Sequence, residues 1–147
     1  MQDKEALDRV VARFFAAFVS SDRGETRLES IVSLFLPEAV IIKGCGAIEV
    51  YSLESFIAPR QKRLNDGTLL QFEEHEVSET TAIFGDVAQR FSVYQKSGVL
   101  AGKPFQERGV KTFQFVRASA GWKIASLAWD DERPGLAIPE NAMPRGA

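Results

Sequence analysis

The sequence has almost none of the residues from which disulfides and metal centres are built. Cys45 is the single cysteine and His75 the single histidine among the 147 residues. One thiol cannot form an intrachain disulfide, and a zinc site would have to rest on carboxylates. We therefore expect no metal and no cofactor in this protein.

An excess of basic residues and long apolar runs are also missing. Lys and Arg number 18 against 20 Asp and Glu, so the net charge is −2 and no surplus exists to neutralise a phosphate backbone. Arg13 and Ser20 interrupt the longest apolar stretch near the N-terminus, so we expect neither a signal peptide nor a membrane-spanning helix. These patterns predict a cytoplasmic protein with no nucleic-acid and no membrane partner.

Phenylalanine is what the sequence has in abundance. Eleven Phe stand beside two Tyr and two Trp, which predicts a dry, aromatic interior or cavity suited to stacking on a bulky apolar ligand. The length of 147 residues and the hydrophobic content of 45% favour one domain with a full core. We place that domain at residues 1–133 and a tail at 134–147, because Pro134 and Gly135 end the last strand.

Apolar residues spaced by three and four predict helices in the first half of the chain. The expected helices span residues 7–18, 28–35 and 53–64. Pro37 removes an amide donor and should end the second helix, Ser52 is a candidate N-cap for the third, and Pro59 predicts a kink or break in it. We thus expect three N-terminal helices, with one short strand over residues 39–42.

After Gly67 the apolar period changes from about 3.6 to about 2, which marks a change from helix to sheet. The four strands expected there span residues 70–77, 83–95, 105–116 and 122–129. Their joints are short and carry turn residues, which favours antiparallel neighbours. The fold class predicted is therefore α+β.

Three groups of residues resemble the landmarks of one superfamily. They are Leu34-Phe35-Leu36-Pro37-Glu38-Ala39-Val40, then Phe84-Gly85-Asp86-Val87-Ala88, and then Gly121-Trp122-Lys123-Ile124 with Trp129. In this order they resemble the nuclear-transport-factor-2-like (NTF2-like) superfamily, whose members include SnoaL-like polyketide cyclases and steroid isomerases. The similarity extends over about residues 7–133.

This resemblance implies a fold and an assembly. The three helices would pack on a strongly curved, mixed but mostly antiparallel sheet that forms a cone with a central pocket. Members of the superfamily commonly form a homodimer through the outer face of the sheet, and we expect the same here. The apolar outer-face residues predicted for that interface are Val110, Val116 and Leu127.

SnoaL-like cyclases carry an acid near the end of the last strand, so the resemblance makes Asp130 the first candidate for a general acid or base. Burial in the cone would raise the pKa of such a carboxyl toward neutrality. The alternative is that residues 130–132 are a solvated strand end. Simple alternation places Asp130 on the face of Trp122 and Ile124, but both faces of this strand are apolar, so the lumen side stays open.

Arg90 and Tyr94 share one face of the strand over 83–95. If that face lines the cone, Arg90 would hold a substrate carboxylate or enolate, and Tyr94 would donate a hydrogen bond to it. The alternative is a cross-strand ion pair of Arg90 with Glu107 or another neighbouring acid on a solvent-facing sheet.

His75 is a further acid/base candidate, because imidazole is the side chain most often used for that role, although its flanking acids also fit a surface histidine. Cys45 has no base nearby in the sequence and fits a small buried thiol better than a nucleophile. Arg60 and Arg63 would either attract an anion at the pocket mouth or form a solvated helix face.

Two functions remain. The first is an enzyme of the cyclase, isomerase or hydrolase kind, which binds a small hydrophobic or carbonyl-containing molecule and uses a buried carboxylate. Steroid isomerisation is disfavoured, because steroid isomerases carry a carboxylate base where this chain has Ile41, Ile42 and Lys43. The second is a non-catalytic ligand-binding or dimerisation module. The residues predicted to line the pocket are Phe14, Phe18, Phe56 and Trp129.

Overall fold

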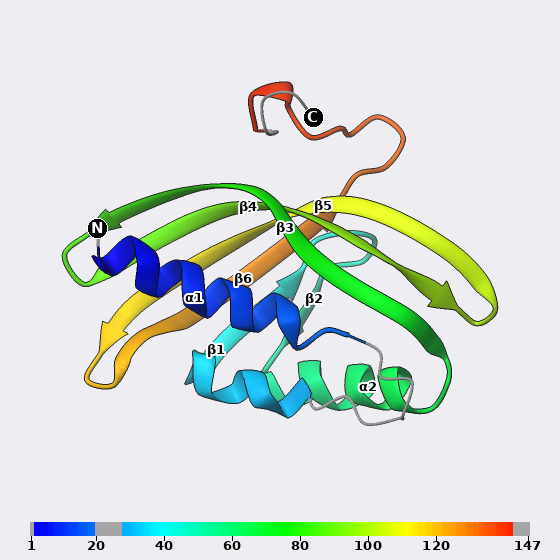
Figure 1. Cartoon of the computed structure of the whole chain (residues 1–147), viewed down its shortest axis with the longest axis horizontal. Coiled ribbons are helices and arrows are strands. Elements are labelled where there is room, and N and C mark those ends of the chain that lie inside the picture. Colours follow the sequence, from blue (N-terminus) through cyan, green and yellow to red (C-terminus); the bar gives the residue numbers. More distant parts are fainter. Residues whose placement is uncertain (1, 20–27, 143–147) are drawn as a thin grey trace.

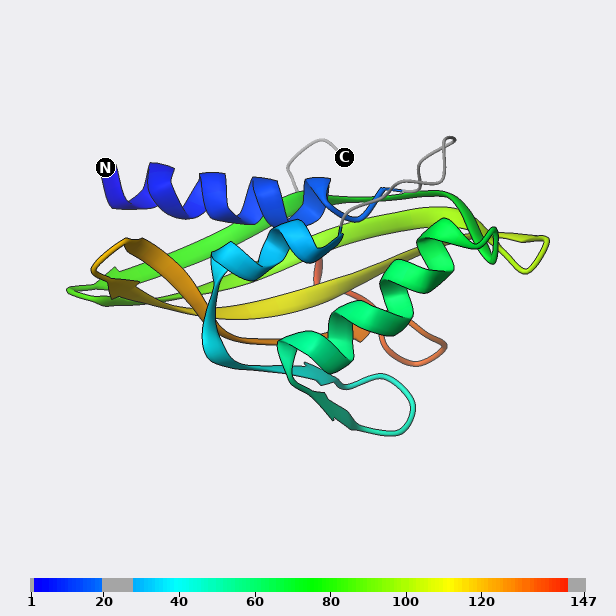
Figure 2. The same ribbon diagram turned by 90° about the horizontal axis from the view of Figure 1, so that it is seen from below.

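The computed structural model describes residues 2–19 and 28–142. It has an α+β fold with one six-stranded mixed sheet, whose long strands arch across the first helix (Figure 1). The view turned by 90° shows this helix and α2 running along the bent sheet (Figure 2). None of the helices in these two stretches has the length and apolar character needed to cross a membrane.

The first helix, α1 (Gln2–Ala16), confirms the amphipathic helix that the sequence predicts. Asp3 and Glu5 in its first turn and Arg13 in its last complement the helix dipole. Its buried stripe faces the sheet and consists of Leu7, Val11, Phe14 and Phe15.

The second predicted helix is shorter and tighter than expected. Residues Leu28–Leu34 form a 3-10 helix, η1, and the chain enters strand β1 (Phe35–Lys43) directly afterwards. Pro37 therefore lies inside β1 and does not end the helix. Strands β1 and β2 (Glu49–Tyr51) separate η1 from the third helix, so the helices do not precede the sheet as one N-terminal block.

The third helix, α2 (Leu53–Asn65), begins where the sequence predicts. Ser52 and Ser55 form a reciprocal capping box at its N-terminus. The predicted break at Pro59 does not occur, and α2 is one continuous helix. Pro59 is exposed, so water can bind the carbonyl that its missing amide leaves without a partner.

The sheet has the strand order β2-β1-β6-β5-β4-β3. Four long strands form an antiparallel meander, and they are β3 (Leu69–Phe84), β4 (Val87–Leu100), β5 (Lys103–Ala118) and β6 (Gly121–Asp131). β1 pairs with β6 in parallel, which confirms a mixed, mostly antiparallel sheet. The strand predicted over 83–95 is wrong at its start, because Gly85 has a φ of 58° and forms the turn between β3 and β4.

A β-bulge in β6 decides which side chains point toward the helices. Between the pairs Gln114↔Ser126 and Phe115↔Ile124, β6 carries one extra residue, Ala125. Ile124 and Leu127 are therefore both buried in the core. The uninterrupted alternation predicted for this strand is wrong, and Leu127 lies inside rather than on the outer face.

The core lies between α1 and the inner face of the sheet and is rich in phenylalanine. Phe14 is fully buried, and its ring centre lies 4.9–6.0 Å from those of four other rings. These four rings belong to Phe15, Phe18, Phe35 and Phe113. Burying one such side chain contributes about 1.5–3 kcal/mol of stability.

Candidate functional site

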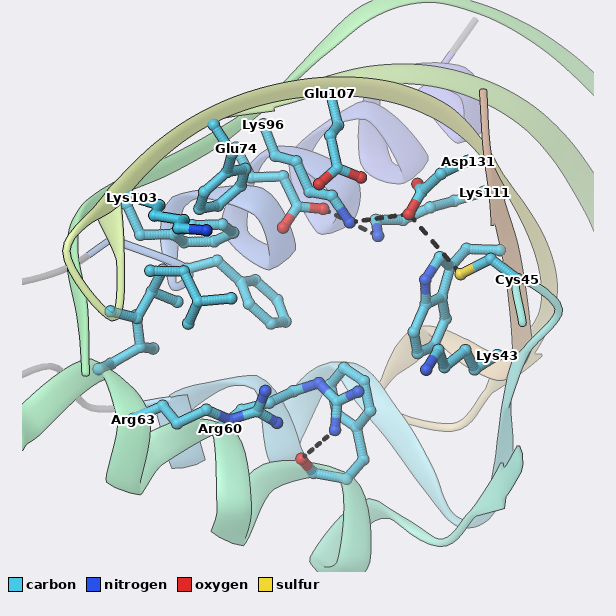
Figure 3. Close-up of a pocket in the computed structure, with 18 of the residues that line it drawn as sticks. Lys43, Cys45, Arg60, Arg63, Glu74, Lys96, Lys103, Glu107, Lys111 and Asp131 are labelled. Atoms are coloured by element: carbon cyan, nitrogen blue, oxygen red, sulfur yellow. Dashed lines mark hydrogen bonds and ion pairs between the residues drawn. The ribbon is translucent and has the colours of Figure 1, made fainter. Parts of the chain in front are cut away.

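A pocket of about 560 Å³ lies between α2 and the arched strands β3, β4 and β5 (Figure 3). α2 forms one side of it with residues that include Arg60 and Arg63, and inner-face side chains of the strands form the opposite side. A pocket of this volume suits a small molecule.

Apolar side chains make up about half of the pocket wall. Phe18, Phe56 and Trp129 line it, as the sequence analysis expects. Phe14 does not, because other core rings surround it completely. Further apolar lining residues are Leu64, Leu69, Phe72, Leu100, Pro104 and Phe105.

The charged part of the wall is strongly unbalanced. It contains six cations, Lys43, Arg60, Arg63, Lys96, Lys103 and Lys111, and three acids, Glu74, Glu107 and Asp131. The whole chain, in contrast, has a net charge of −2. Positive charge is thus concentrated around a largely apolar cavity, and such an arrangement attracts anions.

Arg60 lies over three aromatic rings. Its guanidinium carbon is 4.1 Å from the ring centre of Phe56, 5.0 Å from that of Tyr51 and 5.5 Å from that of Trp129. It also donates a hydrogen bond of 3.1 Å to the Phe56 carbonyl. Burial lowers the pKa of this guanidinium, but an arginine stays protonated in a protein. No acid of the described chain lies within ion-pair distance of Arg60.

Asp131, at the end of β6, is one of the three acids that line the pocket. Its carboxylate accepts hydrogen bonds from the Tyr94 hydroxyl and, at 3.0 Å, from Lys96 Nζ. Burial acts to raise the pKa of Asp131, but Lys96 and the Tyr94 hydroxyl outweigh it and hold the pKa below its usual value. Burial and the Asp131 charge raise the pKa of Tyr94. Asp131 is therefore an ionised carboxylate beside a neutral hydroxyl. The acid of raised pKa that the resemblance implied was Asp130, not Asp131.

Gly109 makes the contact between Tyr94 and Asp131 possible. It lies between them in the sheet, opposite Tyr94 on β4 and Asp131 on β6. A Cβ at this position would lie 2.7 Å from the Tyr94 hydroxyl and 2.5 Å from Asp131 Oδ1. The missing side chain thus lets the two polar groups meet across β5.

Lys111 and Glu74 form the most deeply buried ion pair of the pocket. Lys111 Nζ lies 2.8 Å from Glu74 Oε1, and the two side chains are 9% and 5% exposed. Burial lowers the pKa of Lys111, and the charge of Glu74 opposes that shift.

The Cys45 thiol lies 3.7 Å from Asp131 Oδ2. Burial and the neighbouring Asp131 charge raise the pKa of Cys45, which disfavours the reactive thiolate.

Asp130 lies outside the pocket. Its side chain is 40% exposed and forms an ion pair of 2.5 Å with Arg133. The bulge in β6 gives the inward position to Asp131, so Asp130 has the surroundings of the solvated strand end. Asp130 does not line the cavity, and a catalytic role for it stays a prediction. His75 is also exposed and borders a shallower hollow beside α1.

Arg90 points inward, but it lies under α1 and does not line the pocket. It donates to Glu76 at 2.5 and 3.0 Å and to Asp8 at 2.7 Å. A cross-strand ion pair is therefore present, with Glu76 of β3 as the partner, but the Arg90 side chain is 3% exposed, so the solvent-facing sheet of that alternative is wrong. The guanidinium of Arg90 is thus paired with carboxylates of the protein itself.

Four charged residues of the pocket were not predicted from the sequence, and they are Glu74, Lys96, Lys111 and Asp131. Arg90 and Tyr94 share one face of β4, and the same alternation, extended by two positions, would have placed Lys96 on that face. The inward residues of the other strands could not be predicted in this way, because their register with β4 depends on the turns and on the bulge. In the part of the chain that the structure describes, no three His, Cys, Asp or Glu side chains are grouped to hold a metal ion.

Comparison with known proteins identifies the fold. No family model and no curated protein sequence matches the chain. Among solved structures it is similar to an NTF2-like superfamily protein from Salmonella enterica, with 14% identity, a TM-score of 0.71, and coverage of 90% of this chain and 92% of that one. An NTF2-like protein with a cystatin-like fold from Novosphingobium aromaticivorans is 16% identical, with a TM-score of 0.68 and coverage of 96% and 86%. The CaMKII hub of S. rosetta is 16% identical, with a TM-score of 0.67 and coverage of 87% and 95%. At these identities the similarity shows the fold alone.

Proposed function

Because this chain has the NTF2-like, cystatin-like fold, we propose that its pocket binds a small organic anion with an aromatic or other apolar body, including carbonyl-containing molecules. The observation that carries this proposal is the charge of the pocket, where six cations and three carboxylates surround an apolar cavity. The apolar body would stack on Trp129 and Phe56, and the anionic group would face Arg60.

Arg60 is well suited to hold the anion. Three rings surround its guanidinium, so little side-chain freedom remains to be lost when a ligand binds. Lys43, Arg63 and Lys103 add positive charge around the same cavity, which would accelerate the association of an anion at low salt.

Calorimetric titration with 2-naphthoate tests this proposal. Arg60→Gln should weaken binding about tenfold or more, because a hydrogen bond to a charged group contributes about 1.5–3 kcal/mol. Lys62→Gln is the matched control, since Lys62 is exposed on the same helix and does not line the pocket. Equal affinities of the two variants, or no binding by the wild type, would contradict the proposal.

A second candidate function is an enzyme of the cyclase, isomerase or hydrolase kind. The contact between Tyr94 and Asp131 favours it, because a carboxylate with a fixed hydroxyl donor lies at the pocket wall. With its lowered pKa, Asp131 would act as a base or as an electrostatic partner rather than as an acid. Once a substrate is known, Asp131→Asn should abolish turnover, and full activity of that variant would exclude this role.

We also propose that the protein is a homodimer through the outer sheet face. Phe91, Thr112, Ala128, Ile42 and Val50 follow one another across five strands in that order. Phe91 is 40% and Val50 67% exposed, so this row offers apolar surface to a second copy. Light scattering should give a dimer at micromolar concentration and a monomer for Phe91→Glu, whereas Phe84→Glu at a strand end should remain dimeric. A monomeric wild type would contradict the proposal.

A further inference from the structure

Lys111 combines deep burial with access to the pocket. Its side chain is 9% exposed and lines the cavity. Within residues 2–19 and 28–142, Glu74 supplies the one carboxylate within ion-pair distance of its ammonium, at 2.8 Å. Glu74 Oε1 has no partner with hydrogen-bond geometry in spite of this short distance. An ammonium has three N–H donors, so this pair leaves Lys111 incompletely satisfied.

Aromatic rings surround the Lys111 amine. Its Nζ lies 4.0 Å from the ring centre of Tyr94, 5.3 Å from that of Trp129 and 6.0 Å from that of Phe15. The charged groups that act on it from the neighbouring strands are Glu74 of β3, Lys96 of β4 and Asp131 of β6. Burial and the charge of Lys96 lower the pKa of Lys111, which favours the neutral, nucleophilic amine.

We propose that Lys111 is a nucleophile that forms an imine with an aldehyde or ketone group of the bound anion. This rests on the proposed function, because Arg60 would hold the anionic end of the same molecule. Trp129 connects the two positions, since its ring centre lies 5.5 Å from the Arg60 guanidinium carbon and 5.3 Å from Lys111 Nζ. A flat ligand stacked on Trp129 would therefore have Arg60 and Lys111 within its reach.

Imine formation requires only Lys111, Glu74 and the carbonyl group of the ligand. Glu74 takes one proton from the Lys111 ammonium, and the free amine attacks the carbonyl carbon. A second proton moves from nitrogen to the former carbonyl oxygen, which gives a carbinolamine. Glu74 then returns its proton to the departing hydroxyl, water leaves, and a protonated imine remains paired with the Glu74 carboxylate. The three ammonium protons thus end as two in water and one on the imine nitrogen.

Reductive trapping with 4-formylbenzoate and sodium cyanoborohydride tests this proposal on the full chain. We expect a single adduct on Lys111 by peptide mass mapping. It should form at least about tenfold faster than any adduct on exposed Lys62, because a bound aldehyde meets the buried amine at a high effective concentration. Lys111→Arg keeps a cation beside Glu74 and should remove the adduct, whereas Lys62→Arg, at an exposed position outside the pocket, should keep it.

The outcomes separate this proposal from the proposed function. If benzaldehyde, which lacks the carboxylate, labels Lys111 as fast as 4-formylbenzoate, the proposed anion site is wrong, but Lys111 is still supported as a nucleophile. If 4-formylbenzoate binds in calorimetry but Lys111 stays unmodified, Lys111 is not a nucleophile, but the proposed anion site is still supported. Labelling of all lysines in proportion to their exposure also overturns the nucleophile. These readings need only the wild-type protein, so a variant that fails to fold does not prevent the test.

Discussion

Two clusters of charged residues lie on the inner face of one sheet, and they are built in opposite ways. Under α1, Arg90 contacts Asp8, Glu76 and Glu79, so acids outnumber the buried cation. In the pocket, six cations share the wall with three acids. In the first cluster the acids pair with Arg90 and Lys4, whereas the second cluster leaves positive charge facing a cavity. Burial of a charged residue is therefore a poor guide to a binding site, whereas charge balance and access to a cavity are informative.

The position of α1 accounts for this difference. The helix ends at Ala16, and strands β3, β4 and β5 extend well beyond it (Figure 1). Arg90 lies on the covered part of β4, where Asp8 of the helix reaches it at 2.7 Å. Lys96 lies farther along the same strand, beyond the end of α1, and lines the pocket opposite α2.

Breaking the Arg90 cluster should have the largest effect on stability. Arg90 is 3% exposed on its side chain, and Arg90→Met would leave Glu76 without its cationic partner, whereas Asp8 would keep Lys4 at 2.7 Å. We expect a loss of about 3 kcal/mol in the free energy of unfolding, measured with urea. Arg13→Met, at an exposed position of α1, serves as the control and should change stability little. If Arg90→Met lost much of its ligand affinity but kept its stability, Arg90 would be a binding residue rather than a structural one, and this prediction would be wrong.

Removing one hydroxyl from the pocket cluster should have a smaller effect. Tyr94→Phe keeps the ring beside Lys111 but removes the donor to Asp131. Since the acceptor is a buried carboxylate, we expect a loss of about 1.5 kcal/mol in the same urea experiment. Unchanged stability would mean that Lys96 alone satisfies Asp131.

The pH dependence of stability should reveal Asp131. Its pKa in the folded protein lies below that of an unfolded aspartate, so its contribution is present above about pH 4 and is lost as the pH falls through the folded pKa. The wild type should therefore lose more stability than Asp131→Asn on acidification, as measured by urea unfolding at a series of pH values. Parallel curves for the two proteins would show that Asp131 is not held ionised.

Asp130, the acid next to Asp131, should contribute least to stability and binding. Asp130 is 40% exposed and pairs with Arg133 three residues away on the surface. We expect Asp130→Asn to change the free energy of unfolding by less than about 0.5 kcal/mol and to leave ligand affinity unchanged. A variant that folds normally but loses binding or turnover would return the functional role to Asp130.

Local patterns predicted much of the fold. The stripe of α1, the N-cap at Ser52 and the apolar alternation of the strands depend on residues close in sequence, and the NTF2-like resemblance is confirmed at the level of the fold. The start of β4 depends on the turn at Gly85, and the bulge at Ala125 depends on how β6 pairs with β5, so alternation alone placed Leu127 on the wrong face.

The site was less predictable for the same reason. Aromatic content pointed to Phe18, Phe56 and Trp129, and Arg60 was already weighed as an anion-binding residue. The charge imbalance was hidden, because the six cations come from separate elements and the composition of the chain is slightly acidic. The domain boundary at residue 133, the cytoplasmic location and the homodimer stay predictions.

Comparing 2-naphthoate with its neutral amide tests most directly whether the pocket is built for an anion. The two compounds share the aromatic body and differ in charge. The carboxylate should bind at least about tenfold more tightly at low ionic strength, and the gap should narrow as salt screens the pocket charges. Equal affinities for the acid and the amide at every salt concentration would contradict the account.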